Sequence, residues 1–388
     1  MIRALLLCLA LAGPAAAQEF VVTFGGDVNF AQSRTAPRPG TVSKFGTFPL
    51  GHTTDFLATE LTGDLVFVNV ETVVSETDGV AQPKSFVFRS HPAQIDHLRE
   101  IGVNAFSLAN NHAYDHGWPG LAATLEHFER AAQGGGPILF AGIGRGEEAL
   151  RPAIAEIGGV RVAMSAIGIG SASFAAADGV TGMAMWRVPG QYDAVLRHLA
   201  EAEAELKILS IHAGIENEIA LDRGQAEAFR RAVDEAGVNL VIGHHPHVPR
   251  AVEAGPDHAI FYSLGNLLFV GGAIRDGLPV GHDYGLLGRA YFELGSAEGP
   301  RLTALEAVPL TGVHLAPQPM DAWRGAATIE HLNRLSRTSV GAAAAAFTPV
   351  PGAVPRGAMC LGGPYGPAAR ALCCRLEWSM SCDLPDLM

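Results

Sequence analysis

Short apolar runs alternate with amphipathic segments between about Phe20 and Leu310, and this alternation is the main structural signal in the chain. The amphipathic segments repeat apolar residues every three to four positions and therefore predict helices; they are Thr54 to Leu61, Pro92 to Ile101, Gly117 to Ala132, Gln191 to Leu206 and Arg223 to Ala236. The apolar runs are rich in β-branched or aromatic residues and predict strands; they include Val160 to Ile167, Val238 to Ile242, Ala259 to Ser263 and Gly288 to Leu294. Strands that alternate with helices predict a layered α/β fold with a mostly parallel or mixed sheet.

The pattern weakens after Pro309. Residues Ala326 to Ser336 predict one more helix, whereas Ala342 to Pro355 is rich in Ala, Pro and Gly and resembles a linker. We therefore predict an α/β domain over residues 18–315, followed over 316–388 by a helix, a linker and a cysteine-bearing tail.

The amino terminus has the features of a secretory signal. A basic start at Arg3 precedes the apolar run Ala4 to Leu11, and Ala15-Ala16-Ala17 ends the segment. The apolar run is too short for a bilayer-spanning helix, which needs about 20 apolar residues. We expect cleavage after Ala17, so that residues 1–17 are a signal peptide and the mature chain is exported, to the periplasm or the extracellular space.

The mature chain then keeps four cysteines, all near its end: Cys360, Cys373, Cys374 and Cys382. An even number in an oxidising compartment favours disulfides, although the three possible pairings stay open and vicinal Cys373 and Cys374 are not expected to bridge each other. A zinc site made only of cysteines is the alternative, but the spacing lacks paired C-x-x-C motifs.

The formal charge of the chain is -12 at pH 7. Binding to a phosphate backbone needs a basic surface, so this balance argues against nucleic acid as a partner.

Polar residues with metal-binding side chains stand where the predicted strands end. The carboxyl ends of strands in an open α/β sheet form the ligand crevice, so these residues are expected to converge there. They are Asp27 after Phe20 to Phe24, Glu71 after Leu65 to Val68, Asn111 after Ala105 to Leu108, His212 after Leu206 to Ile211, and His245 and His247 in the turn that starts at Gly243.

This set of side chains predicts a metal site. Two divalent ions about 3.5–4 Å apart need one bridging carboxylate and a few terminal ligands each, and Glu71 is the candidate bridge. Three imidazoles favour Mn, Fe or Zn over Ca or Mg, which prefer oxygen ligands. His112 would then be free to act as a general acid, with Asp115 orienting it. Asp27 and Asn111 also suit simple turns, which is the structural alternative for both.

The ordered motifs resemble those of the capsule-synthesis CapA (poly-γ-glutamate synthesis PgsA) family, which is similar to the calcineurin-like metallophosphoesterases. The resemblance covers about Phe20 to Phe269 and implies a four-layer α/β/β/α sandwich of metallophosphoesterase-like type. It also implies that one ion takes Asp27, Glu71 and His247, and the other Glu71, Asn111, His212 and His245. The motifs that carry it are Gly26-Asp27, Asn69-Val70-Glu71, Ala109-Asn110-Asn111-His112 with Asp115, His212 with Glu216, Gly243 to His247 and Ser263-Leu264-Gly265-Asn266.

Three positions depart from the related patterns. Metallophosphoesterases usually have D-x-H in the first motif and Asp at the bridge, where this chain has Asn29 and Glu71, and the CapA family commonly has His-Trp-Gly where His212-Ala213-Gly214 stands. One or two ions are therefore both compatible with the sequence.

Two functions follow from this reading. The first is an exported metal-dependent hydrolase or transferase that acts on phosphoester, amide or γ-glutamyl bonds in capsule or poly-γ-glutamate synthesis. The second is a non-catalytic envelope protein that binds an anionic polymer during synthesis or export. Either would meet an anionic cell-envelope polymer or its precursor, and membrane-bound polymer-synthesis machinery is a possible partner. The sequence does not indicate the substrate or the oligomeric state.

Overall fold

The computed structural model of the protein describes residues 18–30, 41–43, 46–271, 284–350 and 352–376. The expected signal peptide, residues 1–17, and Cys382 lie outside the described residues. In the described part of the chain, no helix combines the length and the apolar character needed to cross a bilayer.

The larger of two main sheets contains 10 strands among the described residues, in the order β21-β22-β19-β18-β1-β4-β7-β8 with β17 beside β1 and β20 beside β19. Strands β1, β4, β7 and β8 run parallel, whereas β18 joins β1 from the other side in antiparallel register. The bounds are β1 (Gln18–Asn29), β4 (Leu65–Val70), β7 (Ala105–Ser107), β8 (Leu139–Ala141), β17 (Asn266–Phe269), β18 (Tyr284–Leu294), β19 (Arg301–Thr311), β20 (Gln318–Pro319), β21 (Thr348–Val350) and β22 (Arg356–Cys360).

The second main sheet has 6 strands among the described residues, in the order β10-β11-β13-β14-β16-β15. Its central strands β11, β13, β14 and β16 are parallel. Its members are β10 (Ala153–Ile157), β11 (Val160–Gly168), β13 (Leu206–His212), β14 (Leu240–His244), β15 (Val252–Ala254) and β16 (Ala259–Phe261). Smaller two-stranded ladders pair β2 (Thr41–Ser43) with β3 (Gly46–Phe48), β5 (Val73–Val74) with β6 (Arg89–Ser90), and β9 (Ile143–Arg145) with β12 (Thr181–Met183).

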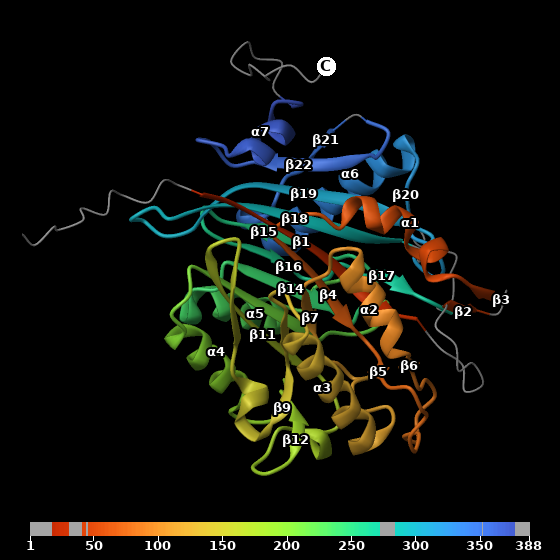
Figure 1. Ribbon diagram of the computed structural model, residues 1–388. Helices are drawn as coiled ribbons and strands as arrows, with labels where there is room; N and C mark the ends of the chain where they lie inside the picture. Colours follow the sequence, from red (N-terminus) through yellow and green to blue (C-terminus); the bar gives the residue numbers. More distant parts are fainter. Residues whose placement is uncertain (1–17, 31–40, 44–45, 272–283, 351, 377–388) are drawn as a thin grey trace, which may run out of the picture.

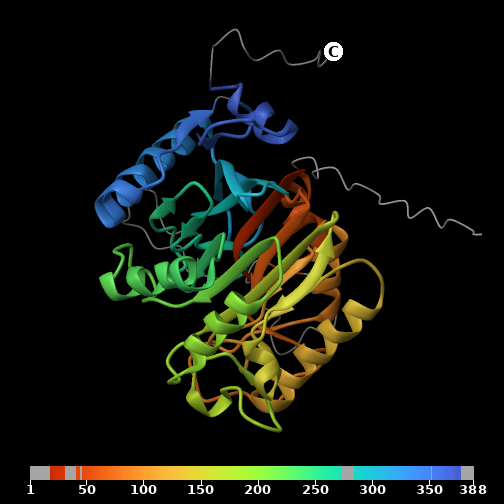
Figure 2. The ribbon, with the colours of Figure 1, turned by 90° about the vertical axis from the view of Figure 1, so that its left-hand side faces the viewer.

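Helices cover the outer faces of the two sheets. The described helices are α1 (Leu50–Glu60), α2 (Pro92–Glu100), α3 (Gly117–Gln133), α4 (Gln191–Glu201), α5 (Arg223–Ala236), α6 (Ala322–Val340) and α7 (Pro367–Cys373), with short 3-10 turns η1 (Gly146–Leu150), η2 (Ala172–Phe174) and η3 (Gly341–Ala343). Figure 1 shows α2 and α3 on one side of the strands and α4 and α5 on the other, and Figure 2 shows the same separation after a quarter turn.

Side-chain alternation along the strands explains this layering. In β13, Ile208 belongs to the hydrophobic cluster that the two sheets share with α2 and α3, whereas Leu209 belongs to the cluster beneath α4 and α5. Successive strand residues point to opposite faces, so a strand covered on both sides is apolar throughout. The predicted four-layer α/β/β/α sandwich is confirmed.

Helix ends follow local capping signals more closely than apolar periodicity. Helix α5 has the predicted bounds because the Asp222 side chain accepts a hydrogen bond from the Gln225 amide and Gly237 ends the helix at φ 64°. Helix α4 ends at Glu201 rather than at the predicted Leu206. Ala202 is extended there, and Leu206 already pairs with Val162 as the first residue of β13.

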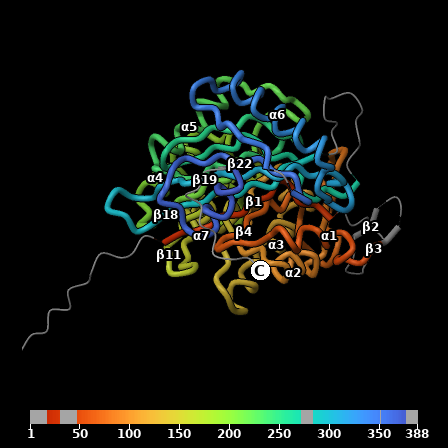
Figure 3. Tube along the Cα trace, turned by 90° about the horizontal axis from the view of Figure 1, so that it is seen from above, coloured from red at the N-terminus to blue at the C-terminus, as the bar shows by residue number. Residues whose placement is uncertain are grey.

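The carboxyl-terminal segment differs from the expected linker and tail. Residues 342–355 contain most of η3 and all of β21, which pairs with β22, and β22 in turn pairs with β19 at the edge of the larger sheet. Figure 3 shows β22, α6 and α7 lying over the strands of this sheet. Backbone groups of β19 pair with β22, and those of β22 pair with the short strand β21, although neither short strand has a clear apolar period.

A disulfide joins Cys360 of β22 to Cys373 of α7. It confirms that cysteines of this segment form disulfides and selects a pairing that the sequence left open. It also removes two thiolates from the alternative cysteine-only zinc site.

Candidate metal centre

The predicted metal-binding residues meet at the carboxyl ends of strands from both sheets. Asp27 lies near the end of β1, Glu71 directly follows β4 and His212 ends β13. His245 directly follows β14, and Asn111 lies in the loop after β7. The parallel direction of these strands brings residues far apart in sequence to one edge, as predicted.

Short distances connect these side chains. His212 Nε2 lies 3.5 Å from Glu71 Oε1 and 2.7 Å from Asn111 Oδ1. His247 Nε2 lies 3.7 Å from the same Glu71 oxygen, and His247 Nδ1 lies 3.3 Å from Asp27 Oδ2. The rings of His212 and His245 have centroids 4.9 Å apart.

Two ligand groups share one carboxylate. In Glu71, His212 and His245, one ligand atom from each residue lies within 4.8 Å of the others, and the same holds for Asp27, Glu71 and His247. These are the two sets that the family resemblance implied, apart from Asn111, which approaches the first group through His212. Glu71 is common to both groups, which is the position of a bridging ligand between two ions.

The Glu71 carboxylate is the best test of whether the site suits a cation. Its side chain is 0% exposed, and neither carboxylate oxygen has a hydrogen-bond partner among the described residues. Burial raises the pKa of this carboxyl well above its usual value. Since buried polar atoms in folded proteins are nearly always satisfied, two orphaned oxygens facing three imidazoles fit a divalent metal ion.

The other ionisable groups give the cluster a negative potential. Burial alone would raise the pKa of Asp27, but hydrogen bonds and charge from His244 and His247 outweigh it and hold this pKa well below its usual value. Burial would lower the pKa of His247, yet the Glu71 charge and the Asp27 hydrogen bond raise it to about 10.

For His245 and His212 the effect of burial is not outweighed, so the net pKa shift is opposite to that of His247. Burial lowers the pKa of His245 to about 4 and that of His212 well below its usual value. Both rings are therefore neutral near pH 7, and a neutral imidazole is the form that binds a metal ion.

Three further side chains contact the candidate ligands, and the sequence analysis did not count them among the ligands. Asn69 Nδ2 donates a hydrogen bond of 2.8 Å to Asp27 Oδ1 and lies 3.1 Å from His212 Nδ1. His244 Nδ1 lies 3.2 Å from Asp27 Oδ1, and Asn266 Oδ1 lies 2.8 Å from His247 Nδ1. Asn69 was detectable, because it stands two residues before Glu71 near the end of the same apolar run.

The turn after β14 has a strained backbone. His245 has φ 95° and His247 has φ 56°, values that non-glycine residues rarely adopt. Such strain costs about 1–3 kcal/mol per residue and persists where the surrounding structure fixes it, which happens often at functional sites. This backbone conformation directs the His245 and His247 side chains of one turn toward the carboxylates.

His112 and Asp115 form a pair beside the metal-binding residues. His112 Nδ1 lies 2.7 Å from Asp115 Oδ2, which leaves Nε2 facing Glu71 Oε1 at 3.9 Å. The Phe88 ring packs on the imidazole with centroids 4.3 Å apart. Burial lowers the pKa of His112, and the hydrogen bond that its ring donates to Asp115 opposes this effect.

Lys84 contacts both members of this pair, and the sequence analysis did not name it as a candidate site residue. Its ammonium forms a salt bridge with Asp115, donates a hydrogen bond of 2.7 Å to the Asn111 carbonyl and lies 3.3 Å from His112 Nδ1. Lys84 belongs to the irregular segment between β5 and β6, where the sequence has no periodic pattern to mark it. The site therefore combines a candidate metal cluster with an oriented imidazole at its edge.

Comparison with known proteins places the chain in a family. The family described as "Bacterial capsule synthesis protein PGA_cap" matches residues 21–270. Capsule biosynthesis protein CapA of Bacillus anthracis is 30% identical over 189 residues, which are 46% of this chain and 43% of that protein. PGA biosynthesis protein CapA of Bacillus subtilis (strain 168) is 27% identical over 216 residues, 55% of each chain. The chain spans about half the length of the curated relatives it matches.

Solved structures resemble the chain more distantly. The calcineurin-like phosphoesterase YfkN from Bacillus subtilis aligns over 82% of this chain and 98% of its own, with 13% identity and a TM-score of 0.42. This likeness carries no functional argument. The family match spans most of the sandwich and contains every predicted site residue. The chain belongs to the PGA_cap family of bacterial capsule synthesis proteins.

Proposed function

We propose that this protein is an exported, metal-dependent hydrolase or transferase that acts in capsule or poly-γ-glutamate synthesis. Its substrate would contain a phosphoester, amide or γ-glutamyl bond, and would be an anionic cell-envelope polymer or its precursor. The observation that carries the proposal is the buried Glu71 carboxylate, whose two oxygens lack hydrogen-bond partners among the described residues and belong to both ligand groups.

The metal would be held by Asp27, Glu71 and His247 at one position, and by Glu71, Asn111, His212 and His245 at the other. Imidazole and carboxylate donors together suit Mn, Fe or Zn. When bound, such an ion lowers the pKa of a coordinated water and stabilises a developing oxyanion. The carboxylates would lose their cost of burial at the same time, because the ion neutralises them.

His112 would supply the proton that the leaving group needs. Its Nδ1 is engaged by Asp115, so Nε2 is the nitrogen that faces the cluster. Asp115 fixes the orientation of the ring, and the salt bridge from Lys84 fixes Asp115. A positioned general acid of this kind contributes about 10²–10⁴-fold in rate.

The first test is metal content. We would purify the chain that begins at Gln18 and measure bound Mn, Fe and Zn by inductively coupled plasma mass spectrometry, beside a His245→Ala/His247→Ala variant. The expected result is one or two equivalents of metal in the parent chain and loss of most of it in the variant. A His258→Ala variant, changed at an imidazole outside the cluster, should keep the full amount.

The second test separates catalysis from binding. The metal-loaded protein would be screened for hydrolysis of phosphoester, amide and γ-glutamyl model substrates, and His112→Ala should lower turnover about 10²–10⁴-fold while the metal content stays unchanged. A parent chain that binds no metal, even after reloading, would refute the proposal. Metal loading without any turnover would support the alternative below.

The alternative is a non-catalytic protein that uses the same cluster to bind carboxylates of an anionic polymer. The observation in its favour is Asn29, a buried amide where related phosphoesterases have an imidazole, which leaves the Asp27 group with one strong ligand fewer. In either case we propose that partners come from the polymer and from membrane-bound polymer-synthesis machinery, with no role for nucleic acid.

A further inference from the structure

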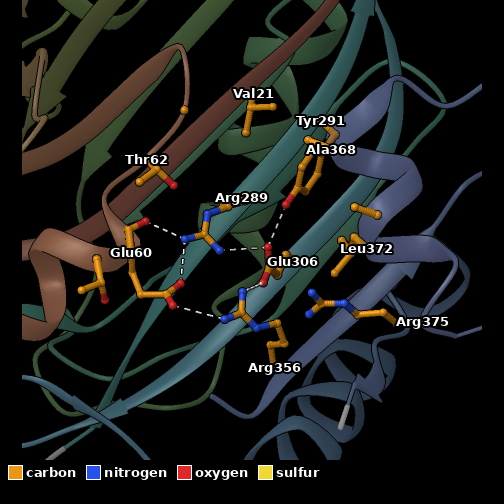
Figure 4. Close-up of a pocket in the computed structure, with 13 residues that line it drawn as sticks. Val21, Glu60, Thr62, Arg289, Tyr291, Glu306, Arg356, Ala368, Leu372 and Arg375 are labelled. Carbon is orange, nitrogen blue, oxygen red and sulfur yellow. Dashed lines mark hydrogen bonds and ion pairs between the residues drawn. The ribbon is translucent and has the colours of Figure 1, made fainter. Parts of the chain in front are cut away.

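A pocket lies at the opposite edge of the larger sheet from the candidate metal centre. Its volume is about 480 Å³, within the range of roughly 300–1,000 Å³ that is typical of small-molecule sites. Val21 and Thr62 line it, and these residues precede or begin the parallel strands whose carboxyl ends carry the metal centre. The rest of the lining comes mainly from β18, β19, β22 and α7, beyond the family match that ends at residue 270 (Figure 4).

Four charged side chains form the wall of this pocket, and we call them the Arg–Glu ring: Glu60, Arg289, Glu306 and Arg356. Arg289 donates to Glu306 Oε2 at 3.0 Å and to Glu60 Oε2 at 2.7 Å. Arg356 donates to Glu60 Oε1 at 3.2 Å and also pairs with Glu306. The four charges balance, so the ring by itself attracts no ion.

Arg375 adds one positive charge that the ring does not balance. Its exposed side chain lines the pocket, and Figure 4 draws no hydrogen bond or ion pair from it to the other lining residues. Nor does its guanidinium pair with any other residue in the described part of the chain. The lining therefore carries three guanidinium groups against two carboxylates, one positive charge in excess.

Two attachments hold α7, the helix that precedes Arg375. The Cys360–Cys373 disulfide attaches α7 to β22. The Glu19 carboxylate also accepts hydrogen bonds of 2.8 Å from the amides of Ala368 and Ala369 at the start of α7. The helix is therefore attached to β1 near its start and to β22 at its end.

We propose that this pocket binds a small monocarboxylate with an apolar body. One excess positive charge matches one carboxylate, and the planar guanidinium of Arg375 can hold it through two hydrogen bonds. The second negative charge of a phosphate dianion would have no matching positive charge in the lining. Leu372, Ala371 and Val21 supply an apolar surface for the rest of the ligand. This site is independent of the proposed function of the metal centre.

Saturation-transfer difference NMR on the chain beginning at Gln18 would test the site, with acetate, butyrate and hexanoate as probes. A chelator in the sample prevents carboxylates from binding to a metal at the other site. The expected result is saturable binding that tightens by up to about fourfold for each added methylene group. Inorganic phosphate has no non-exchangeable protons, so it would be added as a competitor, and it should displace butyrate more weakly than hexanoate does.

Two matched variants locate the binding. Arg375→Gln should weaken butyrate binding at least about tenfold, because it removes a charge-assisted contact. Arg370→Gln makes the same change of charge on α7 at an exposed residue outside the lining, and should bind like the parent chain. Absence of saturable binding, stronger binding of phosphate, or equal effects of the two variants would each overturn the proposal.

Discussion

The candidate metal centre and the Arg–Glu ring both bury several charged groups in one sandwich, but only the ring satisfies all of them. In the ring, Glu306 is 1% exposed and receives hydrogen bonds from Tyr291 and Arg289 as well as the ion pair with Arg356. In the metal centre, Glu71 is equally buried, yet both its oxygens lack hydrogen bonds within the described residues. A matched set of buried charges serves the fold, whereas an unmatched buried charge indicates a ligand.

The largest expected effect tests the matched side of this comparison. Glu306→Gln removes a buried negative charge and leaves Arg289 and Arg356 with Glu60 as their remaining carboxylate, so the free energy of unfolding should fall by about 3–5 kcal/mol. Urea denaturation would measure it, with exposed Glu298→Gln as a control near zero. A loss below about 1 kcal/mol would mean that the ring contributes little to the fold.

The next effect concerns the supports of the metal centre. Asn69→Ala removes the amide that contacts both Asp27 and His212, and it should weaken metal affinity about 10–100-fold without removing a ligand. Competition with a fluorescent chelator would measure the affinity. Unchanged affinity would show that the two ligands need no orientation by Asn69.

The smallest expected effect has the opposite sign to the first. Glu71→Gln removes an unpaired buried carboxylate, so the metal-free variant should be as stable as the parent chain or more stable by about 1 kcal/mol, while metal binding is lost. The measurements are urea denaturation in chelator and mass spectrometry of the metal content. A loss in the free energy of unfolding above about 2 kcal/mol would show that the Glu71 charge stabilises the metal-free fold, as the Glu306 charge is expected to do.

The sequence indicated which candidate ligands would lie together because each follows a recognisable apolar run. Strand polarity alone then places their side chains at one edge of the sheets, as it does for Asp27, Glu71 and His212. Lys84 escaped prediction because it comes from an irregular segment, and its contact with Asp115 depends on how that segment folds back over the cluster. His244 stood beside a predicted ligand, but only the packing of β14 shows that it faces Asp27.

The carboxyl-terminal segment shows that part of the fold also depends on contacts between distant parts of the chain. Residues 342–355 read as a linker because Ala, Pro and Gly carry no apolar period, yet β21 and β22 complete the edge of the larger sheet. The stabilising hydrogen bonds join backbone groups far apart in the chain, and composition does not reveal such partners. The same holds for the choice of Cys373 as the partner of Cys360.

By itself, the sequence determined the layered α/β class, the order of the strands that end in candidate ligands, and the chemistry of those side chains, because periodicity and residue type are local properties. Tertiary structure alone decided which charges are neutralised. Glu306 and Glu71 are both glutamates beside apolar residues, and nothing local separates them. One faces two arginines from other strands and the other faces imidazoles, since the neighbours of a buried charge are brought together only by folding.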